Sequence, residues 1–345
     1  MSGAPNRISF QYRLWDYLVI SDFDLGELEP AHEDDCPYGT LHLSLVPNED
    51  WAEPDGDAVI EYRLDDGRVW FASSKIGDGS GGDGYIARFP GLCSFRIQPE
   101  EMRIDCALQS DLAESTIAHL ILDQAIPRLL SLKEGYVVLH ASAVQVGNQV
   151  IAVLGQSGQG KSTLAAWLGS QGFPLLTDDC LVLKRDEPAQ QWLALPSYQS
   201  VRLWPDSVEA LGIEESGLRE FASYSSKKRT SREVDFRFAS GGSPLRACFV
   251  LADKAAPNPT LSGEPVLRSL SINEAFIALV QGVFRLDVQD AQLNRQEFEV
   301  LTSVTETVRF WSLSYERKYH WLPKVQKAII EAVQPAATSL REGKL

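Results

Sequence analysis

The pattern of hydrophobic and polar positions changes about a third of the way along the chain. Before that point, short runs alternate apolar and polar residues, which is typical of half-buried β-strands. These runs lie at residues 8–15, 40–46, 58–64, 69–74 and 93–98. The break Asp65-Asp66-Gly67 separates two of them and predicts a β-hairpin. We therefore expect residues 1–110 to form a β-rich N-terminal domain.

The next segment has a different period. Apolar residues follow helical spacing over 112–131, and Pro127 is expected to kink or end the first part of this helix. Residues 111–135 are accordingly interpreted as a connecting helix. His119 lies on it and is interpreted as an ordinary helix residue rather than a catalytic one.

From residue 136 the pattern indicates an α/β domain. Strand-like and helical runs follow in the order strand 136–146, strand 149–155, helix 161–172 and buried strand 173–184. A glycine-rich turn joins the second strand to the helix, and this order is typical of a nucleotide-binding βαβ unit. We expect residues 136–335 to form the catalytic domain, with a last helix near 322–333 and a disordered tail at 336–345.

The glycine-rich turn carries a phosphate-binding motif. The residues Gly155, Gln156, Ser157, Gly158, Gln159, Gly160, Lys161 and Ser162, followed by Thr163, fit G-x-x-x-x-G-K-[ST]. Glycines let such a loop wrap a polyphosphate closely, so that its N–H groups and the helix N-terminus face the anion. Lys161 would reach the β- and γ-phosphates of ATP, and the Ser162 hydroxyl would bind Mg²⁺. The alternative is a glycine-rich turn that merely caps a helix.

Two adjacent carboxylates, Asp178 and Asp179, interrupt the following apolar run. Burying them is costly unless they serve a cation or a proton transfer. One could hold Mg²⁺ while the other accepts the proton of an acceptor hydroxyl, and the alternative is an acidic turn at a strand end.

His140 lies one strand before the loop. Because adjacent parallel strands end near one another at a phosphate site, His140 is expected to hydrogen-bond one aspartate and tune its pKa.

Composition narrows the class of partner. The chain has 32 basic and 47 acidic residues and a formal charge of −15, which disfavours binding to nucleic acids and anionic lipids. No apolar run reaches the ~18 residues that a membrane span needs, and the N-terminus lacks a signal-peptide core. We expect a cytoplasmic protein with no nucleic-acid or membrane partner.

Two further features concern cysteines and basic residues. Five dispersed cysteines without C-x-x-C spacing argue against a disulfide framework and a zinc site, and are interpreted as reduced thiols. Lys227, Lys228 and Arg229, with Arg232, form the one basic cluster. It could close on phosphates or on an acidic peptide, or be a solvated loop.

Three segments together resemble the HPr kinase/phosphorylase family, which shares its P-loop core with phosphoenolpyruvate carboxykinases. They are LHASAV (139–144), GQSGQGKST (155–163) and GFPLLTDDCLVL (172–183). The element VRLWPD (201–206) and the β-rich extension are similar to HPr-kinase-like proteins that phosphorylate peptide natural-product precursors, among them lasso-peptide precursors on a terminal serine. The resemblance implies an α/β P-loop kinase domain (HPr kinase / PEP carboxykinase-like) preceded by a β-rich N-terminal domain.

Carried onto this chain, the resemblance implies Asp178 as general base, Asp179 as metal-associated carboxylate, and His140 as the partner of the base. Lys161 and the loop would bind ATP. The implied activity is ATP- and Mg²⁺-dependent transfer of the γ-phosphoryl group to a serine of a peptide or protein. A small-molecule kinase and a non-catalytic ATP-binding switch are the alternatives, and a homo-oligomer is left open. Ala141 stands where HPr kinases carry a glycine, which disfavours HPr itself as acceptor.

Overall fold

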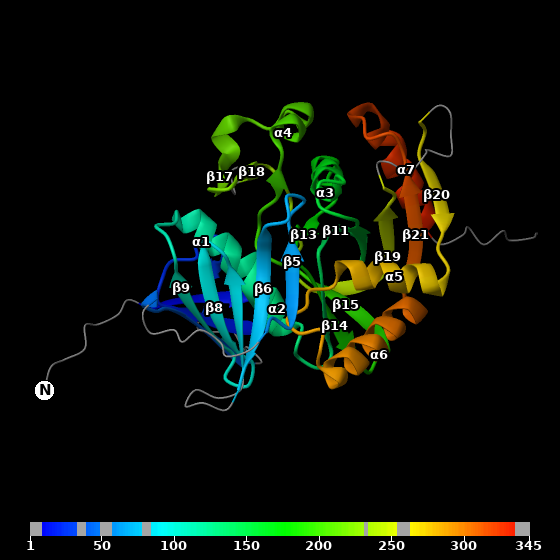
Figure 1. Ribbon diagram of the computed structural model, residues 1–345. Coiled ribbons are helices and arrows are strands. Elements are labelled where there is room, and N and C mark those ends of the chain that lie inside the picture. The colour runs from blue at the N-terminus through cyan, green and yellow to red at the C-terminus, as the bar shows by residue number, and fades with distance from the viewer. Residues whose placement is uncertain are drawn as a thin grey trace, which may run out of the picture.

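Two large β-sheets lie side by side with a long helix between them (Figure 1). The computed structural model describes residues 9–32, 39–48, 57–77, 84–230, 234–253 and 263–334. The predicted disordered tail 336–345, Cys36 and Arg232 lie outside these residues. The described elements make a mixed α/β fold, as the sequence pattern predicts.

The first sheet contains nine strands of the described part of the chain, in the order β3-β1-β2-β4-β9-β8-β7-β6-β5. Their bounds are β1 Phe10–Leu14, β2 Tyr17–Ser21, β3 Glu29–Pro30, β4 Gly39–Leu45, β5 Ile60–Arg63, β6 Val69–Ile76, β7 Gly84–Phe89, β8 Cys93–Gln98 and β9 Arg103–Leu108. The predicted hairpin is confirmed: β5 and β6 are antiparallel, and the Gly67 N–H donates to the Leu64 carbonyl at 2.9 Å. The β4 strand pairs in parallel with both β2 and β9, so the sheet is mixed rather than antiparallel throughout.

One helical segment connects the two sheets. It consists of α1 (Glu114–Leu120), a π-helical turn (Ile121–Ala125) and α2 (Ile126–Leu130). The helix does not end at Pro127. Its hydrogen-bond register changes in the π turn just before the proline, a known way for a helix to absorb an irregularity.

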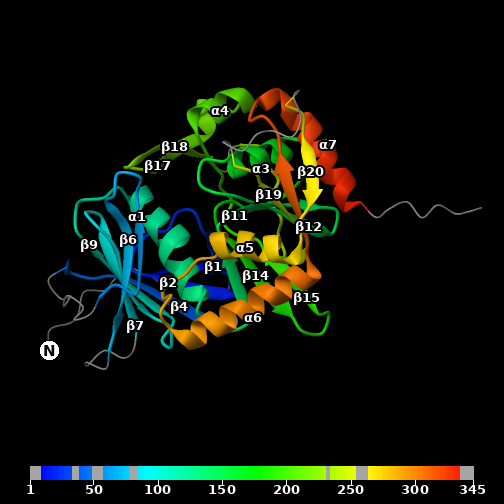
Figure 2. The same cartoon turned by 45° about the vertical axis from the view of Figure 1, so that its right-hand side comes forward.

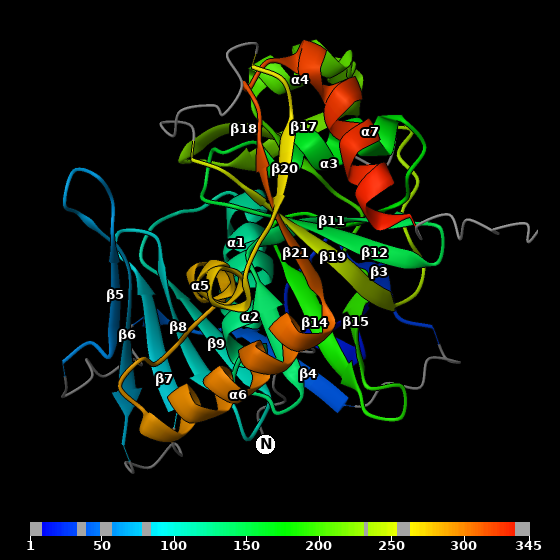
Figure 3. The ribbon, with the colours of Figure 1, turned by 90° about the vertical axis from the view of Figure 1, so that its right-hand side faces the viewer.

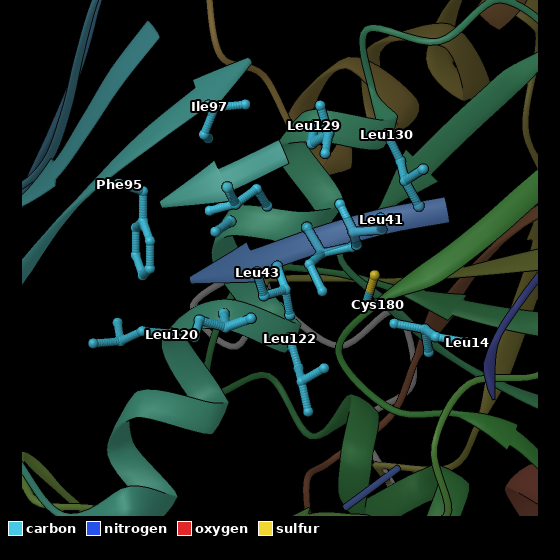
Figure 4. Packing of buried hydrophobic residues seen from close by; sticks show 14 of the residues in the cluster. Leu14, Leu41, Leu43, Phe95, Ile97, Leu120, Leu122, Leu129, Leu130 and Cys180 are labelled. Atoms are coloured by element: carbon cyan, nitrogen blue, oxygen red, sulfur yellow. The ribbon is translucent and has the colours of Figure 1, made fainter. Parts of the chain in front are cut away.

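Apolar side chains of this helical segment fill the space between the sheets. Figure 4 shows Leu120, Leu122 and Leu129 packed with Leu41 of β4 and with Cys180. All of these side chains are at most 1% exposed. Because this core joins residues of both sheets, the helix fixes the N-terminal sheet against the α/β part of the chain.

The second sheet has the order β10-β14-β15-β19-β12-β11-β13, and β21 joins β19 and pairs with β20. The bounds are β10 Tyr136–Leu139, β11 Ala141–Val146, β12 Gln149–Leu154, β13 Leu175–Thr177, β14 Leu181–Asp186, β15 Gln191–Leu195, β19 Ser243–Leu251, β20 Val266–Ser269 and β21 Arg309–Ser314. Parallel pairing is confined to β12–β19 and β19–β21 among the described strands of this sheet.

Helices cover both faces of this sheet (Figure 3). Alternate residues of β12 point to opposite sides, as strand geometry requires. Ala152 and Leu154 pack with α5 (Ile272–Gly282) and α6 (Ala291–Thr307), whereas Val153 packs with α3 (Lys161–Ser170) and α7 (Leu322–Val333). This double burial explains why β12 is apolar without alternation.

Two predicted strands are each broken into two by polar residues. The run 136–146 forms β10 and β11, which separate at His140, and the run 173–184 forms β13 and β14, which separate at Asp178 and Asp179. The expectation that the strand of His140 runs parallel to the strand before the glycine loop is wrong. In the antiparallel β11–β12 pair, Ala141 lies opposite Leu154, so the start of β11 meets the end of β12. His140 therefore lies near the glycine loop because β11 runs antiparallel to β12.

A third, small sheet has the order β16-β18-β17, with β16 Arg202–Leu203, β17 Leu218–Ala222 and β18 Ser225–Thr230. The helix α4 (Pro205–Leu211) follows β16 directly. Figure 2 shows β17 and β18 above α1. The Ser223 N–H donates to Thr116 Oγ1 at 2.9 Å, and the Tyr224 ring packs edge-on against Trp70. This hairpin therefore connects the N-terminal sheet with the segment 201–206.

Candidate active site

The glycine loop forms a tight turn between β12 and α3. Gly158 and Gly160 adopt positive φ angles of 75° and 98°, which glycine adopts without strain. A Cβ on Gly155 would lie 2.5 Å from Gln159 Oε1 and 3.2 Å from Leu251 Cβ. The Gln159 side chain in turn accepts the Gln156 N–H at 2.9 Å. The glycines of the motif thus correspond to positions where a side chain is disfavoured.

Lys161 lies inside the loop rather than in solvent. Its Nζ donates to the carbonyls of Gly155 at 2.9 Å and Gln156 at 3.2 Å, and the residue is 4% exposed. Burial lowers its pKa, and the negative charges of Asp179 and Asp178 partly offset that effect. An anion in the loop could replace these two carbonyls as the acceptor for the ammonium group.

Ser162 and Thr163 begin α3 and are partly exposed. The Thr163 hydroxyl lies 2.9 Å from the Ser207 hydroxyl of α4, so it is engaged in packing two helices. Within the described chain, no hydrogen bond involves the Ser162 hydroxyl. Of the two hydroxyls, Ser162 is therefore the one free to bind a cation or a phosphate.

Asp178 is buried and held on both carboxylate oxygens. Ser142 Oγ donates to Oδ1 at 2.6 Å, and the Arg202 backbone N–H donates to Oδ2 at 2.9 Å. The residue is 2% exposed. Burial and the neighbouring charge of Asp179 raise its pKa, while Arg202 and Ser142 act in the opposite direction.

Asp179 is also buried but differs from Asp178 in backbone conformation, hydrogen bonding and pKa. Its φ of 68° lies in the left-handed region, which is unusual for a residue with a side chain. No donor among the described residues is within hydrogen-bonding distance of its carboxylate. Burial acts to raise its pKa, but the positive charges of His140 (when its ring is protonated), Arg202, Lys227 and Lys161 outweigh burial and hold the pKa below the usual value. Asp179 is thus an ionised carboxylate with free lone pairs.

His140 lies beside Asp179, not beside Asp178 as expected for a partner of the general base. Its Nδ1 is 3.1 Å from the Asp179 carbonyl oxygen and 3.8 Å from Oδ1. A carbonyl only accepts, so Nδ1 carries the proton, and Nε2 of the neutral ring keeps a lone pair. Burial and the charge of Lys161 lower the pKa of His140, which favours this neutral form.

The three described residues of the basic cluster, Lys227, Lys228 and Arg229, make different contacts. Lys228 pairs with Glu220, and Arg229 pairs with Glu27 of the N-terminal part. Lys227 lies over the Trp204 ring, 5.6 Å from its centroid, and its charge acts on Asp179. Of the described members, only Lys227 therefore contributes to the electrostatics of the carboxylate pair.

Sequence reasoning missed an open pocket of about 620 Å³ beside the glycine loop. Its walls come from three distant segments: Gly158, Gln159, Gly160 and Thr163; Trp204, Pro205, Asp206 and Ser207; and Tyr315, Arg317, Lys318, Tyr319 and Leu322. Trp204 is 41% exposed, and the Arg317 guanidinium stacks 4.2 Å from the Tyr315 ring centroid. Aromatic faces beside the glycine loop could stack with a flat ring such as a nucleoside base, and the volume is in the range of small-ligand sites.

The described residues offer few ligands for a metal ion. They contain no group of three or more His, Cys, Asp and Glu side chains that could hold one. Mg²⁺ takes oxygen ligands and commonly uses one or two protein groups together with substrate phosphates. Ser162 and Asp179 fit that requirement, since both offer oxygens without a protein donor.

The four described cysteines are free and buried, as interpreted from their spacing.

Comparisons with known proteins give a distant structural likeness. No protein family model matches the chain, and no curated protein matches it. The chain is similar to the solved structure of the Hpr(Ser) kinase/phosphatase from Coxiella burnetii, with a TM-score of 0.30 and 13% sequence identity. The match covers 56% of this chain and 97% of that chain. A likeness at this TM-score carries no functional conclusion.

In the described residues, no helix has both the length and the apolar character needed to cross a membrane.

Proposed function

We propose that this protein is an ATP- and Mg²⁺-dependent kinase that transfers the γ-phosphoryl group of ATP to a hydroxyl. The proposal rests on the placement of the glycine loop and the aspartate pair, which follow the carboxyl ends of two strands at the same end of the second sheet. The β11 strand lies between β12 and β13 and pairs with both, which brings the ends of β12 and β13 to that end of the sheet. Ser142 of β11 fixes Asp178 there, and the charges of Asp178 and Asp179 act on Lys161.

The nucleotide would occupy the loop and the adjoining pocket. Its phosphates would take the backbone N–H groups of the glycine loop and the N-terminus of α3, with the Gln156 N–H exchanging Gln159 Oε1 for a phosphate oxygen. Lys161 would exchange its bonds to the loop carbonyls for the β- and γ-phosphate oxygens. The base and ribose would lie among Trp204, Tyr315 and Tyr319.

Mg²⁺ would be held by Ser162 and Asp179 together with phosphate oxygens. The lowered pKa of Asp179 keeps its carboxylate ionised, and no described donor competes for its lone pairs. His140 would orient the Asp179 turn through its bond to the Asp179 carbonyl. When bound, the ion would neutralise charge on the phosphates.

Asp178 is the proposed general base. The pKa of Asp178 is raised and that of Asp179 is lowered. Such opposite shifts suit Asp178 to accept a proton and Asp179 to stay ionised. Each Asp178 oxygen accepts one protein hydrogen bond, which leaves it a second lone pair. The base would take the acceptor proton as the hydroxyl attacks the γ-phosphorus.

The proposed acceptor is a serine of a peptide, in particular of a ribosomal peptide natural-product precursor. This finer assignment is supported by the motif resemblance at 139–144, 155–163, 172–183 and 201–206. A non-catalytic switch is less well supported, because simple ATP binding does not need a second buried carboxylate beside the metal-associated one.

The test is transfer of ³²P from γ-labelled ATP to the short peptides encoded beside the gene, with a panel of metabolites in parallel. We expect label on a peptide serine with wild type and none with Lys161→Ala or Asp178→Asn. Lys161→Ala should also weaken ATP binding. Label on a metabolite alone would show that the acceptor is a small molecule and not a peptide. If ATP binds but stays intact with every acceptor, the kinase activity is contradicted.

A further inference from the structure

Arg202 is a buried cation whose guanidinium is held from two sides. It is 1% exposed. Its NH2 group donates to Asp123 Oδ2 at 2.6 Å and to the Tyr198 hydroxyl, and its NH1 group donates to the Asp178 carbonyl at 3.1 Å. A guanidinium is a rigid planar fork, so bonds at both terminal nitrogens fix its orientation.

The Nε donor of Arg202 lies toward Asp179. Arg202 Nε is buried and has no hydrogen-bond partner among the described residues. It lies 3.8 Å from Asp179 Oδ2. That separation is beyond a hydrogen bond, although the positive charge still acts on the carboxylate. A small movement of the guanidinium would therefore convert this proximity into a direct Arg–carboxylate pair.

Asp123 reaches Arg202 from the helix between the two sheets. It lies in the π-helical turn Ile121–Ala125 and is 1% exposed. Its Oδ1 accepts from the Tyr198 hydroxyl, and its Oδ2 lies 2.7 Å from His119 Nδ1 as well as 2.6 Å from Arg202. The π turns of helices occur frequently at functional sites. Here the turn places a buried anion against the Arg202 guanidinium, which bonds the Asp178 carbonyl and lies near the Asp179 carboxylate.

We propose that Asp123 is a positioning residue that holds the Arg202 guanidinium away from Asp179, so that Asp179 stays available to Mg²⁺. This inference rests on the proposed function, because it takes Asp179 as the metal-associated carboxylate. Without the Asp123 charge, the released NH2 group and Nε would pair with the nearest ionised carboxylate, which is Asp179. A bidentate Arg–carboxylate pair would then occupy the oxygens that the ion needs.

The experiment compares wild type with Asp123→Asn in binding a non-hydrolysable ATP analogue, with and without MgCl₂, by titration calorimetry. In wild type, Mg²⁺ should strengthen binding. In the variant that enhancement should fall by about tenfold or more, the usual effect of losing a group that orients a metal ligand. Binding without Mg²⁺ should stay near wild type, because the loop and the aromatic pocket are unchanged. In steady-state assays with Mg²⁺, KM for ATP should rise by a similar factor.

Two further variants separate positioning from a loss of structure. Asp105→Asn is the matched control, since Asp105 is a buried aspartate of β9 that pairs with Arg103 at 2.8 Å in the first sheet. It should leave the Mg²⁺ enhancement unchanged. In an Arg202→Met background, Asp123→Asn should have no further effect on the enhancement, because the group it restrains is gone.

The outcomes either support or overturn the inference. A folded Asp123→Asn protein with the wild-type Mg²⁺ enhancement overturns it, as does an equal loss in Asp105→Asn. If Asp123→Asn does not fold, Tyr198→Phe removes one anchor of the same NH2 group and should lower the enhancement in the same direction; no change there overturns the inference. If wild type binds the analogue with Mg²⁺ enhancement but transfers no phosphoryl group, only the proposed kinase activity is contradicted. Wild type without any nucleotide binding contradicts both.

Discussion

The hydroxyl of Ser142 donates to Asp178 Oδ1 at 2.6 Å, and both side chains are at most 2% exposed. This bond connects the β11 strand to the turn that follows β13. The bond matters because β11 lies between β13 and β12, the strand that leads into the glycine loop. Together with the Arg202 backbone N–H, which donates to Oδ2, Ser142 thus fixes Asp178 relative to the glycine loop.

Replacing Ser142 by alanine should raise the pKa of Asp178 further, because the serine hydrogen bond acts to lower it. A base must be deprotonated to work, so the acid limb of the kcat–pH profile should move to higher pH. A buried carboxylate oxygen that loses its donor should also destabilise the fold by about 1–3 kcal/mol. Ser142→Thr keeps the hydroxyl and is the control. An acid limb that stays in place in the alanine variant would argue against Asp178 as the base.

The two aspartates should differ when each is changed to asparagine. Asp178→Asn should lower kcat by roughly 10²–10⁴-fold while ATP binding stays near wild type, since only the proton acceptor is lost. Asp179→Asn should instead raise the Mg²⁺ concentration needed for half-maximal rate. Steady-state kinetics over a Mg²⁺ series separates these effects. The reverse pattern would exchange the two roles.

The aromatic pocket gives a prediction about nucleotide affinity. Trp204→Ala should raise KM for ATP by about tenfold with little change in kcat, because stacking on a base contributes roughly 1–3 kcal/mol in comparable nucleotide sites. Tyr62→Ala is a matched control, since Tyr62 is 39% exposed on β5 and lies outside the pocket. An unchanged KM in Trp204→Ala would show that the base binds elsewhere.

Local sequence patterns predicted helices and strands well where the apolar residues of a segment follow a single helical or strand period. The strand at 93–98 and the helix at 322–333 have the bounds that the pattern indicates. The glycine loop was found because its chemistry needs fixed spacing within eight residues. Each of these signals is contained in one short stretch of chain.

What the sequence could not show depends on contacts between distant segments. Residues 136–146 are one apolar run, and nothing local reveals that β10 and β11 pair with different strands on either side of His140. Asp123 and Arg202 are 79 residues apart, so their ion pair has no sequence spacing to recognise. The pocket likewise combines three segments that only the packing of α4 and α7 against α3 brings together.

The lowered pKa of Asp179 predicts how its contribution to stability depends on pH. A carboxylate whose folded pKa is below its usual value of 3.8 stabilises the fold above that pH. The contribution is lost as the pH falls from about 3.8 through the folded pKa. Asp179→Asn should therefore lower the free energy of unfolding at pH 7, and the gap to wild type should narrow below pH of about 4. Asparagine tolerates the positive φ at this position, so backbone strain does not confound the comparison. Urea unfolding of both proteins at several pH values measures the gap, and a gap that stays constant or widens on acidification would show that the nearby cations do not stabilise the Asp179 carboxylate.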